Sequence, residues 1–224
     1  MPPFSSPQPA IHNFRVYLNN LANATTTGFK AERTFARVMG DALPVIDTRT
    51  DMRVGTLQPT GSELDFALEG GGFFVVETAA GERLTRGGSF SLDEAGRIAD
   101  ANGNLLLGES GPISAAQGAI TVDRGGLVRV DGKEVDRLRV ETVPEEVRLQ
   151  HDSGNLFLPE PARQPAEVEQ RGVRQGFLED SNVNTVGTLV NMISIQRAYS
   201  SVQKVVTTLG GVRGTISNDL GKPV

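Results

Sequence analysis

The chain has 224 residues and a formal net charge of −5, and it contains no cysteine, which excludes disulfides, thiol catalysis and cysteine-ligated metal sites. The excess of acidic residues argues against a nucleic-acid partner, because such a partner requires clustered lysine and arginine. No apolar run is long enough to predict a membrane span, so membrane insertion is not expected.

The N-terminal end of the sequence predicts one short amphipathic helix. Residues 1–9 carry no basic residue and no apolar stretch, so they are not typical of a cleaved signal peptide, and any export is expected to use another route. Residues 10–21 are predicted to be helical, with one narrow apolar seam. The seam consists of Ala10, Phe14, Tyr17 and Leu21. The threonine run at 25–27 and Gly28 predict the end of the helix.

The middle of the chain is typical of short strands joined by tight turns. Residues 31–60 contain Pro44, Pro59 and a mixture of Asp, Thr and Arg, and they are predicted to be an irregular linker that pairs edge-on with another segment. Residues 61–143 are predicted to form a compact, mostly antiparallel β domain, because Gly70–Gly72, Asn102–Gly103 and Asp131–Gly132 favour tight turns between apolar runs. Residues 144–180, which are rich in proline, are predicted to lead back out of that domain.

The C-terminal end predicts a second, longer helix that begins near Asn182 or Asn184, both suitable N-caps, and ends at Gly210–Gly211. It carries one apolar seam of Val186, Val190 and Ile193 and another of Ile195, Tyr199, Val202, Val206 and Leu209. Amphipathic helices commonly pack on their own domain. However, the sequence has no acidic residue before Glu32 or between Ser181 and Asn218, and this favours terminal helices that contact other chains.

Residues for catalysis or for binding a metal, a cofactor or a small-molecule substrate are not evident in the sequence. The two histidines, His12 and His151, form no metal-binding motif. The glycine run at 70–72 lacks the spacing of a phosphate loop. Two remote alternatives are a hydrolase that uses His151 with a nearby acid, and a secreted β-rich binding module.

Three groups of segments, in order along the chain, resemble the bacterial flagellar rod and hook proteins. The matching segments are 18–23 with 27–30, then 64–70, 72–76, 84–86, 88–90 and 92–93, and finally 176–179, 181–184, 192–193 and 196–199. Within this family, residues 108–113 and 216–221 look most like the proximal rod subfamily, and the distal rod subfamily is the alternative. The sequence departs from the family in the proline-rich residues 1–9, in Ser200, where relatives usually have glutamate, and in Gly71 and Gly210, where they often have aspartate.

The resemblance implies a non-enzymatic axial protein of the flagellar basal body, in the rod that crosses the periplasm. It implies polymerisation with copies of itself and with other rod subunits, transmission of torque, and export by the flagellar type III apparatus. We therefore expect an α+β fold in which the N- and C-terminal helices pair as a coiled-coil-like domain beside the β domain. The expected parts are residues 1–30, 31–60, 61–143, 144–180 and 181–224.

The expected assembly interface lies on the two terminal helices and on the asparagine-rich segments at their inner ends. The asparagine side chains are expected to hydrogen-bond between helices. The candidate residues are Phe14, Tyr17, Leu18, Asn19, Asn20, Leu21, Asn23, Phe29, Asn182, Asn184, Val186, Val190, Ile193, Arg197, Tyr199, Val202, Val206 and Leu209.

Overall fold

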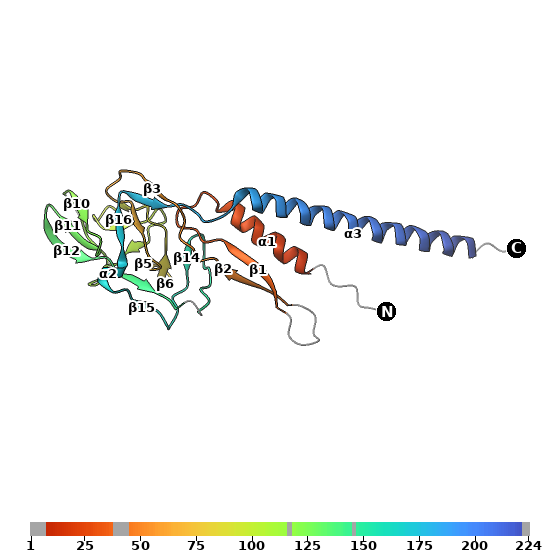
Figure 1. Ribbon diagram of the computed structural model, residues 1–224, viewed down its shortest axis with the longest axis horizontal. Helices are drawn as coiled ribbons and strands as arrows, with labels where there is room; N and C mark the ends of the chain where they lie inside the picture. The colour runs from red at the N-terminus through yellow and green to blue at the C-terminus, as the bar shows by residue number, and fades with distance from the viewer. Residues whose placement is uncertain (1–7, 38–44, 116–117, 145–146, 221–224) are drawn as a thin grey trace. The chain divides into compact units, whose positions relative to one another are not determined.

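The computed structural model describes residues 8–37, 45–115, 118–144 and 147–220 (Figure 1). The chain divides into two compact units, each of which is described by itself. The helical unit comprises Met1–Leu21 and Asn184–Val224, and the β unit comprises Ala22–Val183. Within the described residues, helices long and apolar enough to cross a membrane are absent.

The helical unit contains α1 (Gln8–Ala22) and α3 (Thr185–Leu220). Asn184 caps α3, because its Oδ1 accepts a hydrogen bond of 2.8 Å from the amide of Gly187. The sequence predicts that the glycine pair at 210–211 ends this helix, but the helix continues through the pair. Each glycine costs only about 1 kcal/mol of helix propensity and removes no backbone hydrogen bond, so the pair is tolerated.

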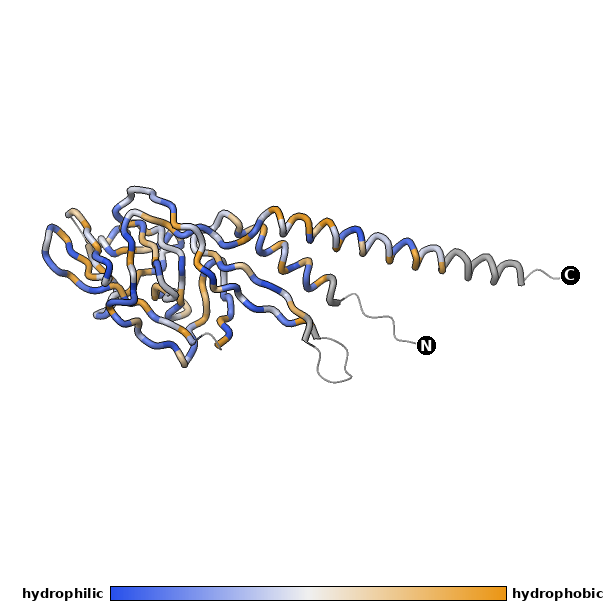
Figure 2. The backbone as a smooth tube through the Cα atoms, in the orientation of Figure 1, coloured by the Kyte–Doolittle hydropathy of each residue, from blue (hydrophilic) through white to orange (hydrophobic). Residues whose placement is uncertain are grey.

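The predicted pairing of the terminal helices as a coiled-coil-like domain is wrong. The described residues form mostly β-strands in several sheets, with a longer helix near each end, α1 and α3. A coiled coil buries its seam residues between the helices, whereas Val202 and Val206 in the α3 seam are 60% and 58% exposed. Figure 2 shows apolar residues at intervals along the described part of α3. The spacing therefore predicts which residues share a helix face, but it does not identify what covers them.

The largest sheet of the β unit has eight antiparallel strands. Its path is β14-β6-β5-β9-β8-β7, and β13 pairs with both β5 and β15. The strands are β5 (Phe73–Thr78), β6 (Gly81–Thr85), β7 (Ser91–Leu92), β8 (Ile98–Ala99), β9 (Leu105–Leu106), β13 (Val140–Thr142), β14 (Leu156–Phe157) and β15 (Gln164–Pro165).

Smaller sheets complete the β unit and join segments that are distant in the sequence. A three-stranded sheet contains β10 (Ile120–Val122), β11 (Leu127–Val130) and β12 (Lys133–Arg137). The strand β3 (Leu57–Pro59) pairs with β17 (Phe177–Glu179), and β4 (Phe66–Leu68) pairs with β16 (Val173–Gln175), which follows the short helix α2 (Val168–Arg171). The C-terminal part of the β unit therefore returns to the strands that precede its main sheet.

The core of the β unit lies on both faces of β5. Alternate residues of a strand point to opposite faces. Phe74 and Val76 belong to one hydrophobic cluster, and Phe73 and Val75 belong to another. All four of these side chains are buried. Each cluster removes apolar surface from water, and this burial contributes roughly 25 cal/mol of stabilising free energy per Å². The clusters consist of residues of the β unit, so this stabilisation does not need the terminal helices.

The structure differs from the sequence prediction in residues 31–60. The strand β1 (Glu32–Arg37) pairs antiparallel with β2 (Val45–Thr50), and β3 also lies in this region. Polar and apolar residues do not alternate in β1 and β2. The charged residues Glu32 and Arg33 are adjacent in β1, and β2 continues with polar residues through Arg49 to its end. The missing period-two pattern explains why sequence reasoning does not find these strands.

The turn at Asp131–Gly132 is confirmed. Asp131 has φ 50° and Gly132 has φ 76°, and the turn joins β11 to β12. The glycine run at 70–72 is not a hairpin turn, because β4 and β5 belong to different sheets. Gly88 is required for close packing, since a Cβ atom there would lie 1.6 Å from the carbonyl oxygen of Phe66.

Candidate functional site

The described part of α3 carries large apolar side chains that are exposed to solvent. They are Val186, Leu189, Val190, Ile193, Tyr199, Val202, Val205, Val206 and Leu209, with exposed fractions between 45% and 71%. Single exposed apolar residues are common on protein surfaces, but a contiguous set marks an interaction surface. The helix therefore presents a surface that is suited to burial against a partner.

These apolar residues form two faces of α3. At about 100° per residue, Val186, Leu189, Val190 and Ile193 lie on one side of the helix, and the set from Tyr199 to Leu209 lies on roughly the opposite side. We call these the proximal face and the distal face. A helix with apolar residues on opposite sides is buried completely only when it has a neighbour on each side.

Five hydroxyl groups of α3 donate hydrogen bonds to the backbone of the preceding helical turn. Hydroxyls of this helix donate to the carbonyl four residues earlier, at 2.8–3.0 Å. The donors are Thr188, Ser194, Ser201, Thr207 and Thr208. Because these donors already have an acceptor, burial of the helix surface does not leave them without a hydrogen bond.

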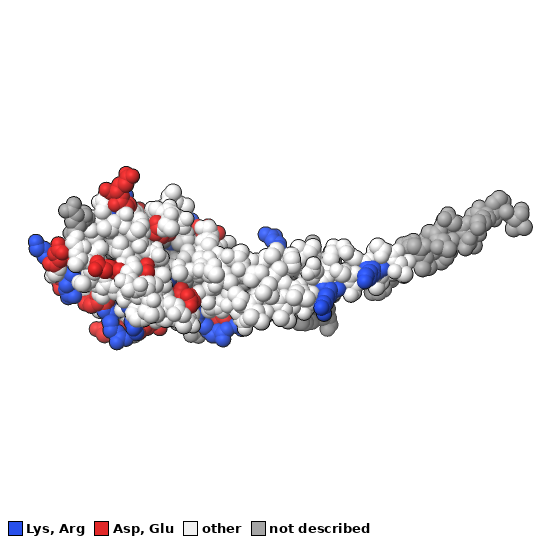
Figure 3. Space-filling model, turned by 90° about the horizontal axis from the view of Figure 1, so that it is seen from above, with Lys and Arg blue, Asp and Glu red and all other residues white. Residues whose placement is uncertain are grey.

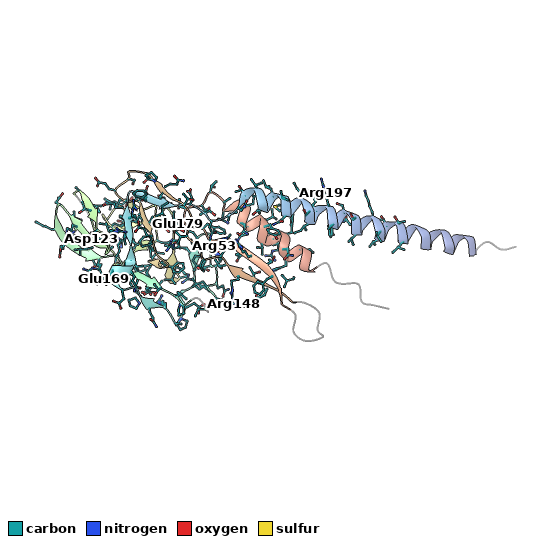
Figure 4. All side chains as sticks on the ribbon, viewed as in Figure 1. Arg53, Asp123, Arg148, Glu169, Glu179 and Arg197 are labelled. Carbon is teal, nitrogen blue, oxygen red and sulfur yellow. The ribbon has the colours of Figure 1, made fainter. Side chains whose placement is uncertain are left out.

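The helical unit carries almost no acidic residue, whereas the β unit is rich in them. Between its first residue and Leu209, α3 carries Arg197 and Lys204 but no acid. On the face shown in Figure 3, acidic side chains gather over the β unit, whereas the described helical part shows basic side chains. Arg197, which was predicted as an interface residue, is exposed on α3 (Figure 4).

The predicted interface residues of α1 differ in exposure. Leu18 is 44% exposed, whereas Asn20 is buried. Phe14, Tyr17 and Leu21 are half-buried, and Asn19 is exposed. Asn23 lies just after the helix, where its Oδ1 accepts a hydrogen bond of 3.3 Å from the hydroxyl of Thr26. Fewer side chains of α1 are therefore exposed than were predicted to lie in the interface.

Phe29 and Asn182, which were also predicted as interface residues, are engaged within the β unit. The Phe29 side chain is fully buried and its ring stacks on His151 with the centroids 5.4 Å apart. The Asn182 side chain bonds to backbone groups of residues 31, 51 and 53. Both side chains are therefore already engaged within the β unit.

A buried cluster of charges lies beside these residues, and the sequence prediction missed its role. The Glu179 carboxylate bonds to the ammonium group of Lys30 and, at 2.7–2.8 Å, to the guanidinium of Arg86. The same carboxylate accepts a hydrogen bond of 2.8 Å from the Gly55 amide. Figure 4 shows Glu179 among the strands of the β unit. Each of these charged residues lies in a segment that carries the family resemblance. That resemblance is the only feature of the sequence that points to their role.

Burial opposes the charged forms of the two cations in this cluster. It lowers the pKa of Lys30, and Glu179 partly counteracts this effect. Burial also lowers the pKa of Arg86, and Glu179 again favours the charged form. Arg86 donates further hydrogen bonds to the carbonyls of Leu68, Gly70 and Gly72, at 2.5–3.1 Å. Glu179 is therefore the counterion that allows both cations to be buried.

His151, the histidine of the hydrolase alternative, lies in an aromatic cluster. Its ring centroid is 5.4 Å from that of Phe29 and 4.3 Å from that of Phe157. Pockets of about 600 and 610 Å³ lie in the β unit, and His151 lines neither of them. Among the described residues, clusters of side chains able to hold a metal ion are absent. The surroundings of His151 thus favour a packing role.

The packing of His151 predicts a pH dependence of stability. Burial lowers the pKa of His151 below its usual 6.5, and Glu32 opposes this shift. The folded protein keeps the ring neutral at pH values where the unfolded chain already takes up a proton. His151 therefore contributes full stability above the unfolded pKa and loses it as the pH falls toward the lower folded pKa.

We expect His151→Phe to reduce the loss of stability at acidic pH, because phenylalanine keeps the aromatic contacts and does not titrate. Urea midpoints of the wild type and the variant at about pH 7.5 and 5.5 measure the effect. The wild type is expected to lose more stability than the variant between these conditions. An equal loss in both proteins would contradict this account of His151.

Models of two protein families match the chain. The model described as the C-terminal part of flagellar basal-body rod FlgEFG proteins matches residues 174–219. The model described as the D1 domain of the flagellar hook protein FlgE/F/G matches residues 67–151. The matched segments contain Arg86, Glu179 and Asn182 and most of α3.

The chain is also similar to curated rod proteins over most of its length. It is 33% identical to the flagellar basal-body rod protein FlgF of Rhizobium meliloti (strain 1021), over 87% of this chain and 90% of the relative. It is 31% identical to FlgF of Caulobacter vibrioides, over 92% of this chain and 91% of the relative. It is 28% identical to the flagellar basal-body rod protein FlgG of Agrobacterium fabrum, over 93% of this chain and 94% of the relative.

Proposed function

The chain belongs to the family of flagellar basal-body rod proteins and is FlgF-like, and we propose that it polymerises through α1 and α3 to build the rod and transmit torque. The observation that carries this proposal is the exposure of apolar residues on two opposite faces of α3. A subunit with two such faces contacts more than one neighbour. We propose the exposed predicted residues of α1 and α3 as the contact surface.

Assembly supplies the apolar burial that the helices lack in the isolated chain. α1 has 15 residues, a length at which an isolated helix is only marginally stable in water. Each apolar contact between subunits removes surface from water, and this burial contributes roughly 25 cal/mol of stabilising free energy per Å². The entropic cost of ordering the helices is subtracted from this gain. The internally bonded hydroxyls of α3 reduce the desolvation cost of the same burial. Order in the terminal helices is thereby coupled to polymerisation.

We propose copies of this chain and other rod subunits as the neighbours, and the basal-body rod as the location. Export by the flagellar type III apparatus is part of the same proposal. A non-enzymatic role is supported by the use of His151 in packing and of Lys30, Arg86 and Glu179 in a buried ion cluster. A hydrolase would instead lose a measurable activity on His151→Ala, and a secreted binding module would need no partner for its helices.

A photo-crosslinking phenylalanine analogue at Tyr199 is expected to capture rod subunits in cells. Tyr199 is 46% exposed on the distal face, and the analogue keeps its aromatic character. Gel electrophoresis after irradiation, followed by mass spectrometry of the products, identifies the captured protein. We expect adducts with another copy or with another rod subunit, and their loss in a strain whose flagellar export is blocked. Absence of rod-subunit adducts in an assembling strain would overturn the proposal.

A further inference from the structure

The segment that follows α1 and the segment that precedes α3 are joined to each other inside the β unit. The amide of Gly28 donates to the carbonyl of Glu179 at 2.7 Å, and the amide of Asn182 donates to the carbonyl of Phe29 at 3.3 Å. We call residues 28–31 and 179–182 the junction. Because both segments belong to the β unit, their pairing is independent of the arrangement of the two units.

The side chain of Asn182 ties the junction to a third segment of the chain. Its Oδ1 accepts a hydrogen bond of 2.7 Å from the amide of Ala31. Its Nδ2 donates to the carbonyls of Asp51 and Arg53, at 2.7 and 2.9 Å. An amide side chain is suited to this position because it offers an acceptor and two donors in one plane.

The charges of the junction reinforce the same three segments. Lys30 donates to the carbonyl of Arg53 at 2.8 Å, and Glu179 accepts from the amide of Gly55 at 2.8 Å. The residues that hold the junction lie outside both hydrophobic clusters of the β unit. The Asn182 side chain itself bonds to backbone groups and belongs to neither hydrophobic cluster, so we expect both clusters to stay packed when it is removed.

We propose that Asn182 is a positioning residue for rod assembly, which holds the exits of the two chain ends side by side so that both terminal helices reach their neighbours together. This inference rests on the proposed polymerisation through α1 and α3. Without Asn182 the core of the β unit stays folded, but the two exits separate more readily. The two helices are then presented less closely together, and part of the entropic benefit of presenting both from one point is lost.

The chain offers a closely matched control for this role in Gln175. Its side-chain Oε1 accepts a hydrogen bond of 3.0 Å from the amide of Val122, and its Nε2 donates to the carbonyls of Glu63 and Ile120, at 2.8 and 2.7 Å. Gln175 thus makes the same kinds of bond as Asn182, and both side chains are half-buried. Its bonds, however, lie away from the junction.

The experiment compares the full-length variants Asn182→Ala, Gln175→Ala and Val202→Asp. In the purified Asn182→Ala variant, hydrogen exchange at the amides of Gly28 and Ala31 is expected to accelerate roughly tenfold or more, as for loss of a bond that limits local opening. The Gln175→Ala variant is expected to leave these amides unchanged. In cells, incorporation into isolated basal bodies is expected to fall for Asn182→Ala but not for Gln175→Ala. Asn182→Asp, which keeps the acceptor for Ala31, is expected to restore part of both properties.

Equal exchange at Gly28 and Ala31 in Asn182→Ala and the wild type would overturn the inference. Equal loss of incorporation in Asn182→Ala and Gln175→Ala would also overturn it, because the effect would then be one of general stability. Val202→Asp separates this failure from failure of the proposed function. If it blocks incorporation while Asn182→Ala does not, only the role of Asn182 is wrong. If Val202→Asp is incorporated normally, the proposed polymerisation surface is wrong.

Discussion

Val202→Asp is expected to abolish rod assembly and swimming while the β unit stays folded. Val202 lies on the distal face of α3 and is 60% exposed, so a carboxylate there is solvated in the free subunit and costs little. In the assembled rod the same carboxylate would be buried without a counterion. The effective penalty for such burial is of the order of several kcal/mol per ion. The penalty recurs at each copy of the interface, so assembly is affected far more than folding.

Ser200→Asp is the matched control for this variant. It adds the same charge two positions away but on the opposite side of α3, which here carries Arg197 and Lys204. This position lies about two turns beyond Ile193, the last residue of the proximal face. The substitution also restores an acid where the rod and hook family usually has glutamate. Swimming in soft agar and thermal unfolding of the purified variants measure function and folding. Full motility of Val202→Asp, or equal loss of motility in both variants, would count against the distal face as an interface.

Glu179→Gln is expected to destabilise the β unit by about 3–5 kcal/mol, the usual cost of removing one partner of a buried ion pair. The glutamine keeps the size of the side chain but leaves Lys30 and Arg86 without their counterion. Both cations are almost fully buried, with 2% of each side chain exposed. Arg86 retains its bonds to backbone carbonyls, so Lys30 bears much of the penalty. Urea denaturation measures the change in the free energy of unfolding.

Two further variants separate charge from packing in this cluster. Glu169 is an exposed carboxylate of the same unit, so Glu169→Gln is expected to change stability by less than about 0.5 kcal/mol. Adding Lys30→Met to Glu179→Gln removes the unpaired ammonium group and is expected to recover part of the lost stability. A small effect of Glu179→Gln, or a further loss in the double variant, would refute the account of Glu179 as the shared counterion.

Local features of the fold were predictable from the sequence. The positive φ angles at Asp131 and Gly132 follow from residue type, because the bonds of a tight turn lie between near neighbours. The helical spacing from Ile195 to Leu209 likewise predicts one apolar side of α3. The seam alone did not predict the partner, since an apolar face has the same pattern whether its own chain or another covers it. The coiled-coil prediction failed at that step.

Non-local features were not predictable in the same way. Lys30 and Glu179 are separated by 149 positions, and no spacing rule brings them together. Phe29 and Asn182 were assigned to the assembly surface because they lie in segments that resemble the rod and hook family. Their burial and bonding inside the β unit depend on strand pairings, such as β3 with β17, that the sequence pattern does not specify. The resemblance thus marked these segments without showing that Phe29 and Asn182 are engaged inside the β unit.

The most direct test of polymerisation through α3 is the amount of this chain in basal bodies isolated from cells that express Val202→Asp or Ser200→Asp at equal levels. Quantitative mass spectrometry of the purified basal bodies gives this amount relative to the wild type. If α3 polymerises through its distal face, Ser200→Asp is present at the wild-type level and Val202→Asp is absent. Val202→Asp at the wild-type level in complete rods would contradict it.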